Sequence, residues 1–318
     1  MTILFFGSSK YSTIVASALN KTFGLTLVVT IPDRTIGRKK ILTPSPVKQF
    51  AIDNNVPVLT FDKLDKEAVE KIKASLKNVI PSAVEESLTS KSVEKDPSMH
   101  PSDAVWMTKA VPDFLVVADY GLILSDTLLQ LPKYVPLNVH HSLLPKYRGP
   151  SPAPTTILHG DKISGVSIIH MTDEVDAGPI LAQQKYTLKA DETTDSLLTI
   201  LNTLGGELVV DVIKNFGSTK PVAQDESKAT FTKHMTKQDG FIDLENPPSP
   251  AKLDRMIRAY YPWPKVWTKC EVRSQKFEVL NFLPKQKIQV GGGKAMSIKD
   301  FLNGYPEMKE PISKLGYS

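Results

Sequence analysis

Cysteine is nearly absent from this chain, since Cys270 is the only one among 318 residues. One thiol cannot form an internal disulfide, and it cannot contribute to a metal site built from several cysteines. No apolar run approaches the length of a membrane span, and the first residues lead straight into an apolar strand without a basic region or a cleavage site. We therefore expect a protein that works away from the membrane, in the cytoplasm, or in the mitochondrial matrix if a presequence has been removed.

The sequence also lacks the glycine-rich fingerprint of dinucleotide-binding proteins. Its first strand-like run ends at Phe6-Gly7-Ser8-Ser9, which has one glycine where that fingerprint needs three. The motif therefore argues against a nicotinamide cofactor and predicts only a tight turn from a strand into a helix.

Charge is unevenly distributed along the chain. Residues 226–318 hold 16 Lys and Arg against 10 Asp and Glu, a net charge of +6, whereas residues 1–225 hold 23 against 24. A basic C-terminal third beside a near-neutral remainder favours a polyanionic partner for that third. The alternative is that its lysines only keep the surface soluble, and charge alone leaves both interpretations open.

Strand-like and helix-like segments alternate through the first part of the chain. Apolar, β-branched runs predict strands, and segments with helical periodicity follow them. This rhythm predicts an α/β fold with a doubly wound, mostly parallel sheet, whose ligands bind beyond the carboxyl ends of the strands. The predicted strands are residues 2–6, 25–31, 56–59, 114–118, 134–139 and 165–171, and the predicted helices include residues 46–54, 63–76 and 194–216.

Two polar segments interrupt this pattern. Residues 78–111 are polar and proline-containing, which predicts an insertion, and residues 217–228 predict a linker. The chain therefore divides into a first domain over residues 1–216 and a second over residues 229–318. The second is strand-like and rich in proline, which predicts a smaller β-barrel-like domain.

The most informative motif joins Asn138 and His140 with a later acidic residue, Asp176. Asn138 and His140 are two residues apart at the end of a predicted strand, so their side chains point to the same face. An amide can donate to a developing oxyanion, an imidazole can carry a proton near neutral pH, and a carboxylate can orient the imidazole. Alone, an Asn-x-His pair is more often structural, and an Asp before Ala-Gly is typical of a turn.

The string from Asn138 to Gly149, with Asp176 further on, resembles the folate-dependent formyltransferases. The resemblance implies that the predicted sheet is a Rossmann-like variant. It also implies that 10-formyltetrahydrofolate is the co-substrate and that no metal is needed. The catalytic residues that it implies are Asn138, His140 and Asp176. It also implies donor-binding contacts from the turn after them, Ser142, Leu143, Leu144 and Pro145. His141 stands where a small glycine usually follows the histidine.

A second stretch, Ala-Asp-Tyr-Gly-Leu-Ile-Leu over residues 118–124, resembles the folate-pocket segment of the same family. The resemblance implies further donor contacts from Tyr120, Gly121, Ile123 and Leu124. Asp119 stands where the family has an apolar or small residue. Simple packing at the end of a strand is the alternative interpretation of this stretch.

A basic loop over residues 31–40 resembles the loop that methionyl-tRNA formyltransferases insert into the acceptor end of their tRNA. The resemblance implies tRNA contacts from Arg34, Arg38, Lys39 and Lys40, with Arg38 at the position that helps to select initiator tRNA. A solvated loop without a ligand is the alternative. On a predicted helix nearer the C-terminus, Arg255 and Arg258 are spaced so that they share a face and could meet phosphates.

The resemblance implies transfer of a formyl group from 10-formyltetrahydrofolate to the α-amino group of methionine on initiator methionyl-tRNA, for translation initiation, by a monomer. A Pro-Trp-Pro segment at residues 262–264 resembles the start of the family's C-terminal domain, although the tail after it is shorter than usual. The alternatives are a formyltransferase for an amino sugar or other small amine, a hydrolase or dehydrogenase of the same formyl-folate, and a non-catalytic RNA-binding module.

Overall fold

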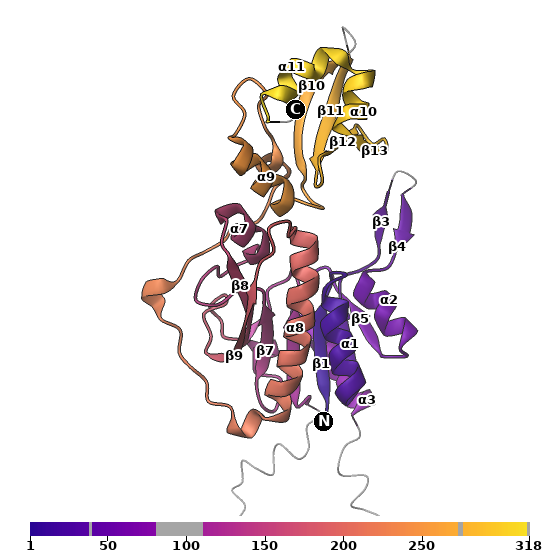
Figure 1. Cartoon of the computed structure of the whole chain (residues 1–318). Coiled ribbons are helices and arrows are strands. Elements are labelled where there is room, and N and C mark those ends of the chain that lie inside the picture. The colour runs from indigo at the N-terminus through magenta and orange to yellow at the C-terminus, as the bar shows by residue number, and fades with distance from the viewer. Residues whose placement is uncertain (38–39, 81–110, 273–275, 317–318) are drawn as a thin grey trace, which may run out of the picture. The chain divides into compact units, whose positions relative to one another are not determined.

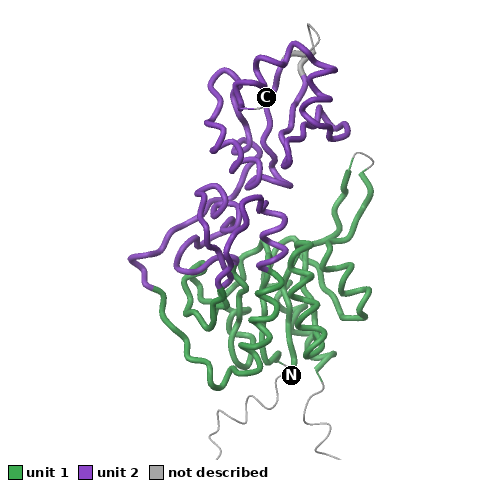
Figure 2. The backbone as a smooth tube through the Cα atoms, in the orientation of Figure 1, with its two compact units in different colours: residues 1–140, 167–184, 202–224 green, residues 141–166, 185–201, 225–318 purple. Residues whose placement is uncertain are grey.

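The computed structural model describes residues 1–37, 40–80, 111–272 and 276–316. The chain forms two compact units, drawn in different colours in Figure 2. Unit 1 comprises Met1–His140, Ser167–Gln184 and Asn202–Gln224, and unit 2 comprises His141–Val166, Lys185–Leu201 and Asp225–Ser318. Most of the predicted insertion, residues 81–110, lies outside the described residues, and the proposed domain boundary at residues 217–228 stays a prediction.

The largest sheet that the structure describes has seven strands in the order β5-β2-β1-β6-β7-β8-β9 (Figure 1). The first five strands in this order pair in parallel, and β7 pairs with β8 in the antiparallel direction, which confirms the predicted mostly parallel α/β sheet. The strands are β1 (Ile3–Gly7), β2 (Leu27–Thr30), β5 (Val58–Thr60), β6 (Phe114–Ala118), β7 (Pro136–His140), β8 (Ile163–His170) and β9 (Ile180–Thr187). Every residue of β1, β2 and β6 is buried, because central parallel strands are covered on both faces.

Helices flank this sheet, and their ends follow local sequence signals. Ser45 accepts a hydrogen bond from Lys48 N at the start of α2, and Asp65 accepts one from Ala68 N at the start of α3. One face of α3 is buried and contributes Ile72 to the core of unit 1. The helices are α1 (Ser12–Phe23), α2 (Pro46–Asp53), α3 (Lys66–Val79), α6 (Asp126–Leu129), α7 (Pro152–His159) and α8 (Thr194–Lys214).

Helix α8 is long and apolar enough, by length and composition, to cross a membrane. The sequence-based statement that no segment approaches this length was therefore wrong for α8. Half of its most apolar stretch is buried inside the protein. Within unit 1, a side chain added at Gly206 would lie 3.1 Å from Ala18 Cβ of α1, so the two helices pack closely there. This packing is typical of a helix in the core of a globular fold.

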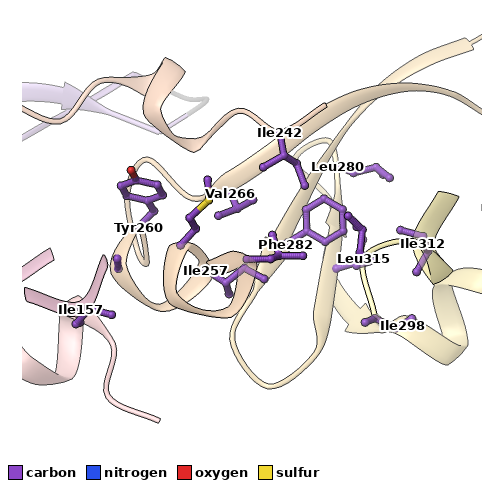
Figure 3. Packing of buried hydrophobic residues seen from close by; sticks show 14 of the residues in the cluster. Ile157, Ile242, Ile257, Tyr260, Val266, Leu280, Phe282, Ile298, Ile312 and Leu315 are labelled. Atoms are coloured by element: carbon purple, nitrogen blue, oxygen red, sulfur yellow. The ribbon is translucent and has the colours of Figure 1, made fainter. Parts of the chain in front are cut away.

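The C-terminal part of unit 2 contains a small four-stranded antiparallel sheet, where the sequence predicts a β-barrel-like domain. Figure 3 shows Phe282 and Leu280 of this sheet gathered with Ile257 and Leu315 in one apolar cluster. The elements are α9 (Pro250–Ala259), β10 (Val266–Val272), β11 (Lys276–Leu283), β12 (Lys287–Val290), β13 (Ala295–Ser297), α10 (Ile298–Gly304) and α11 (Lys309–Ser313).

Two segments differ from the loops that the sequence predicts. The basic loop after β2 contains a short antiparallel hairpin of β3 (Arg34–Ile36) and β4 (Ile41–Thr43). The segment predicted as a linker contains 3-10 turns at Phe216–Ser218 and Glu226–Lys228. Between these turns, Val222 forms an antiparallel bridge with Ile180, the first residue of β9.

Candidate active site

Asn138 and His140 lie on β7, at the point where the sheet changes from parallel to antiparallel pairing. Asn138 is in register with Val117 of β6 and with Ile169 of β8. The two side chains share a face of the strand because they are two residues apart. They therefore lie near the carboxyl end of a parallel strand, where sheets of this kind bind ligands.

Asp176 lies in the connection between β8 and β9 and contacts both Asn138 and His140. Its Oδ1 accepts a hydrogen bond from Asn138 Nδ2 at 3.1 Å and lies 3.5 Å from His140 Nδ1. The side chains of His140 and Asp176 are only 6% and 12% exposed. The structure therefore brings together the three residues predicted from the sequence, in surroundings where charge interactions are stronger than in water.

This arrangement has a clear chemical capability. An Asn amide carries two N–H groups, so Asn138 can donate one to Asp176 and the other to a developing oxyanion. A carboxylate beside Nδ1 of His140 favours the tautomer with a proton on that nitrogen. Among the described residues, no group of three or more His, Cys, Asp or Glu is placed to hold a metal ion. The catalytic roles of the three residues stay a prediction.

Gln224 contacts the loop of Asp176, and sequence reasoning did not single it out. Its Nε2 donates to the carbonyl oxygens of Asp176 and Gly178, each at 2.7 Å. Gln224 belongs to the segment predicted as a linker, in which a polar side chain carries no local signal of such a contact.

The predicted donor-binding turn lies in unit 2 and has its own internal bonds. Ser142 Oγ donates to Lys146 O at 2.6 Å, and the Leu144-Pro145 peptide bond is cis. The side chains of Ser142 and Leu144 are buried, whereas that of Leu143 is only partly buried. In this turn, therefore, backbone groups and Leu143 are better placed to meet a ligand than the hydroxyl of Ser142.

The second predicted donor-binding stretch follows β6 in unit 1. Tyr120 packs edge-on against Phe6, and burial raises the pKa of its hydroxyl, which has no hydrogen-bond partner among the residues that the structure describes. Leu124 is part of the core, and Gly121 has open space where a side chain would be. Ile123 is 84% exposed, so it is the apolar side chain of this stretch that is available to a ligand.

Asp119, the departure in this stretch, has a structural role in unit 1. Its carboxylate accepts hydrogen bonds from Ser9 Oγ at 3.0 Å and from Asn202 Nδ2 at 3.4 Å, and its carbonyl accepts from Ser8 N at 3.2 Å. Its backbone adopts a positive φ of 46°, which Asp tolerates better than most residues. The carboxylate therefore joins the end of β6 to the turn after β1 and to α8.

The predicted tRNA-binding residues fall into two groups. Arg34 begins β3, and Lys40 precedes β4, while Arg38 and Lys39 lie outside the described residues. On the hairpin, three apolar side chains are exposed: Ile36 by 58%, Ile41 by 60% and Leu42 by 64%. The hairpin thus presents both cationic and apolar side chains.

The second group lies on α9 and is largely engaged within unit 2. Arg255 Nε donates to Leu158 O at 3.1 Å. Arg258 donates to Asp254 Oδ2 through Nε and Nη2, and to Glu192 O through Nη1 at 3.2 Å. These bonds direct the guanidinium groups toward the protein.

Comparison with known proteins defines the class to which this fold and this site belong. The family model described as formyl transferase matches residues 1–213, more than half of the chain. The chain therefore belongs to the formyl transferase family, which confirms the resemblance noted in the sequence and makes the protein a formyltransferase enzyme.

Curated relatives and solved structures agree with this assignment. A methionyl-tRNA formyltransferase of Caldicellulosiruptor saccharolyticus is 29% identical and covers 98% of this chain and 99% of its own length. That of Chloroflexus aggregans is 37% identical over 84% of this chain and 76% of its own length. A solved methionyl-tRNA formyltransferase from Clostridium thermocellum has a TM-score of 0.55 at 14% identity, covering 94% of this chain and 99% of its own.

A sugar 3N-formyl transferase, solved in the presence of dTDP and 5-N-formyl-THF, has a TM-score of 0.53 at 17% identity. It covers 92% of this chain and 94% of its own. At these identities the two solved structures show a shared fold, and the choice of acceptor needs other evidence.

Proposed function

We propose that this protein transfers a formyl group from 10-formyltetrahydrofolate to the α-amino group of methionine on initiator methionyl-tRNA. The observation that carries the proposal is the similarity to a curated methionyl-tRNA formyltransferase over 98% of the chain. The trio of Asn138, His140 and Asp176 and the basic hairpin support it. The protein would act in translation initiation, as a monomer in the cytoplasm or, if a presequence has been removed, in the mitochondrial matrix.

The trio acts on the carbonyl that the amine attacks. A bond forms between the amino nitrogen and the formyl carbon to give a tetrahedral intermediate, and the bond from that carbon to the folate nitrogen then breaks. The second N–H of Asn138 donates to the oxygen of the tetrahedral intermediate, with His140 beside it. One donor of this kind typically contributes about 3–4 kcal/mol to the transition state.

Asp176 keeps the other two residues in place and balances charge. Its carboxylate orients the amide of Asn138 and lies beside the imidazole of His140. The attacking amine loses one proton and the leaving folate nitrogen gains one. We assign the first of these protons to Asp176, which receives it through a water molecule.

The residues after β6 fit a flat pterin ring with polar edges. Ile123 offers an exposed apolar side chain, and the family resemblance implies a contact from Tyr120 as well. The family resemblance adds Gly121, Leu124 and the Ser142–Pro145 turn to the donor contacts. Apolar walls with a few polar groups are what small-molecule sites generally provide.

The β3–β4 hairpin is the part of the chain that suits a tRNA acceptor. Cationic side chains attract phosphates, and exposed apolar side chains can stack against an opened base pair. We propose that Arg34 and Lys40, with Arg38 and Lys39, make these contacts. The bonds of Arg255 and Arg258 within unit 2 leave them a smaller share in tRNA binding.

The test is an acceptor comparison with the purified protein and 10-formyltetrahydrofolate. Charged initiator methionyl-tRNA, uncharged tRNA and a nucleotide-linked amino sugar are supplied in parallel, and the formylated product is measured. We expect product only with methionyl-tRNA. Formylation of the amino sugar but not of methionyl-tRNA would identify a sugar formyltransferase. Release of formate without any acceptor would identify a hydrolase.

A further inference from the structure

We propose that Gln224 is a positioning residue for Asp176. This inference rests on the catalytic role given to Asp176 in the proposed function. Gln224 holds the loop backbone so that the carboxylate of Asp176 faces Asn138 and His140. All four residues belong to unit 1.

The loop of Asp176 has a conformation that needs support from its surroundings. Asp176 has a positive φ of 54°, a backbone region that residues other than glycine seldom adopt, although Asp tolerates it better than most. Close by, a side chain at Gly178 would collide with the carbonyl oxygen of His170. The loop is also closed by a hydrogen bond of 3.0 Å from His170 N to Pro179 O. On this side, therefore, the loop lies directly against the end of β8.

Gln224 supplies the hydrogen bonds that hold the other side of the loop. One amide nitrogen donates to both Asp176 O and Gly178 O at 2.7 Å, which uses its two N–H groups. Removing this amide would leave two partly buried carbonyl groups without these donors. The loss of a buried hydrogen bond destabilises a protein more than the loss of an exposed one. The backbone on either side of the carboxylate-bearing residue would then be less constrained.

The position of Gln224 is itself fixed by the sheet. Val222 N donates to Ile180 O, and Ile180 N donates to Val222 O, both at 2.8 Å. This bridge sets the register of the segment two residues before Gln224. The predicted linker is therefore bonded to β9 and, through Gln224, to the loop that carries the proposed catalytic carboxylate.

The functional consequence follows from the distances around Asp176. Its Oδ1 is 3.1 Å from Asn138 Nδ2 and 3.5 Å from His140 Nδ1, so a displacement of about 1 Å would weaken both contacts. Loss of Gln224 should therefore resemble partial loss of the Asp176 carboxylate, without an effect of its own on substrate binding.

The experiment compares Gln224→Met, which keeps length but removes both N–H donors, with Val222→Ala as the matched control. The control shortens an exposed side chain in the same segment and keeps its backbone bonds. We expect Gln224→Met to lower kcat roughly 10- to 100-fold, with both KM values within about twofold of the parent. We expect Val222→Ala to keep the parent kcat.

Two further measurements separate positioning from a general structural role. In an Asp176→Asn background, Gln224→Met should change kcat less than about twofold, because its effect acts through the carboxylate. A full additional loss in that background would overturn the proposal. Hydrogen–deuterium exchange should show faster exchange of the amides of residues 174–178 in Gln224→Met than in the parent, and unchanged exchange there would also overturn it.

The exchange measurement does not depend on the acceptor. If the parent failed to formylate methionyl-tRNA, the proposed function would be wrong. The contact between Gln224 and the Asp176 loop would still be supported or refuted by the exchange of residues 174–178.

Discussion

Oδ1 of Asp176 and Nδ1 of His140 lie 3.5 Å apart, with both side chains almost entirely shielded from solvent. The same oxygen accepts the hydrogen bond from Asn138. One carboxylate oxygen thus contacts both an amide and an imidazole, and the proposed mechanism needs both of these groups at one carbonyl.

The first prediction concerns the charge of Asp176. Asp176→Asn keeps the shape of the side chain and an oxygen for Asn138 but removes the negative charge beside His140. We expect kcat to fall by roughly 10²-fold or more, since general acid–base groups typically contribute 10²–10⁴-fold. Steady-state kinetics at saturating donor and thermal unfolding measure this. A kcat within threefold of the parent, in a protein that unfolds at the same temperature, would remove Asp176 from the mechanism.

The second prediction concerns the amide of Asn138. Asn138→Ala should lower kcat by roughly 10²–10³-fold while the KM for the donor changes little, because the amide acts mainly in the transition state. Asn246→Ala is the control, since Asn246 is exposed and its amide donates to the exposed Asp243. An equal loss in the control, or a change confined to KM, would contradict this role.

The third prediction concerns the basic hairpin. Arg38→Ala should lower kcat/KM for methionyl-tRNA. It should also make the plot of log binding constant against log salt concentration less steep by about one, as expected when one phosphate contact is lost. Lys77→Ala on α3 removes the same charge from an exposed position and should leave both quantities unchanged. Identical salt slopes for Arg38→Ala and the parent would make the hairpin an ordinary surface feature.

The fourth prediction concerns stability against pH and an ion pair in unit 2. Arg148 is buried, and its guanidinium donates two hydrogen bonds to Glu226, which lowers the pKa of that carboxyl. A carboxyl with a lowered pKa in the folded state stabilises the fold above its unfolded pKa of about 4.3, and this contribution is lost as the pH falls through the folded value.

We therefore expect Glu226→Gln to have a lower Tm than the parent at pH 7. The difference in Tm between the two proteins should become smaller as the pH falls below about 4. Thermal unfolding from neutral to acidic pH measures this. Lys294→Gln removes a charge from an exposed side chain of the same unit and serves as the comparison. A constant difference in Tm across this range would show that the ion pair does not carry the effect.

The sequence predicted the central strands and the residues of the trio for physical reasons. Continuous apolar runs such as Ile3–Gly7 can only be buried strands or helices, and their length and neighbours decide for strands. Asn138 and His140 follow from the alternation of side chains along a strand. The prediction of Asp176 rested on the family motif, because no local sequence pattern indicates that a residue between β8 and β9 will contact β7.

What could not be predicted depends on contacts between distant parts of the chain. Gln224 bonds to carbonyl groups 46 and 48 residues earlier, and no local pattern encodes such a pair. The hairpin at Arg34–Thr43 has exposed apolar side chains on both strands, so it lacks the alternation that marks a half-buried strand. The hydrogen bond from Arg258 to the carbonyl of Glu192 likewise joins residues that are 66 apart in the chain.

The central claim is formyl transfer to methionyl-tRNA by the trio, and one measurement tests it most directly. The purified protein is mixed with 10-formyltetrahydrofolate and either charged initiator methionyl-tRNA or buffer alone, and formyl-methionine and formate are followed over time. We predict formyl-methionine only when the tRNA is present, with Asn138→Ala nearly inactive. Formate released equally in both mixtures, or no formyl-methionine from the parent protein, would contradict the account.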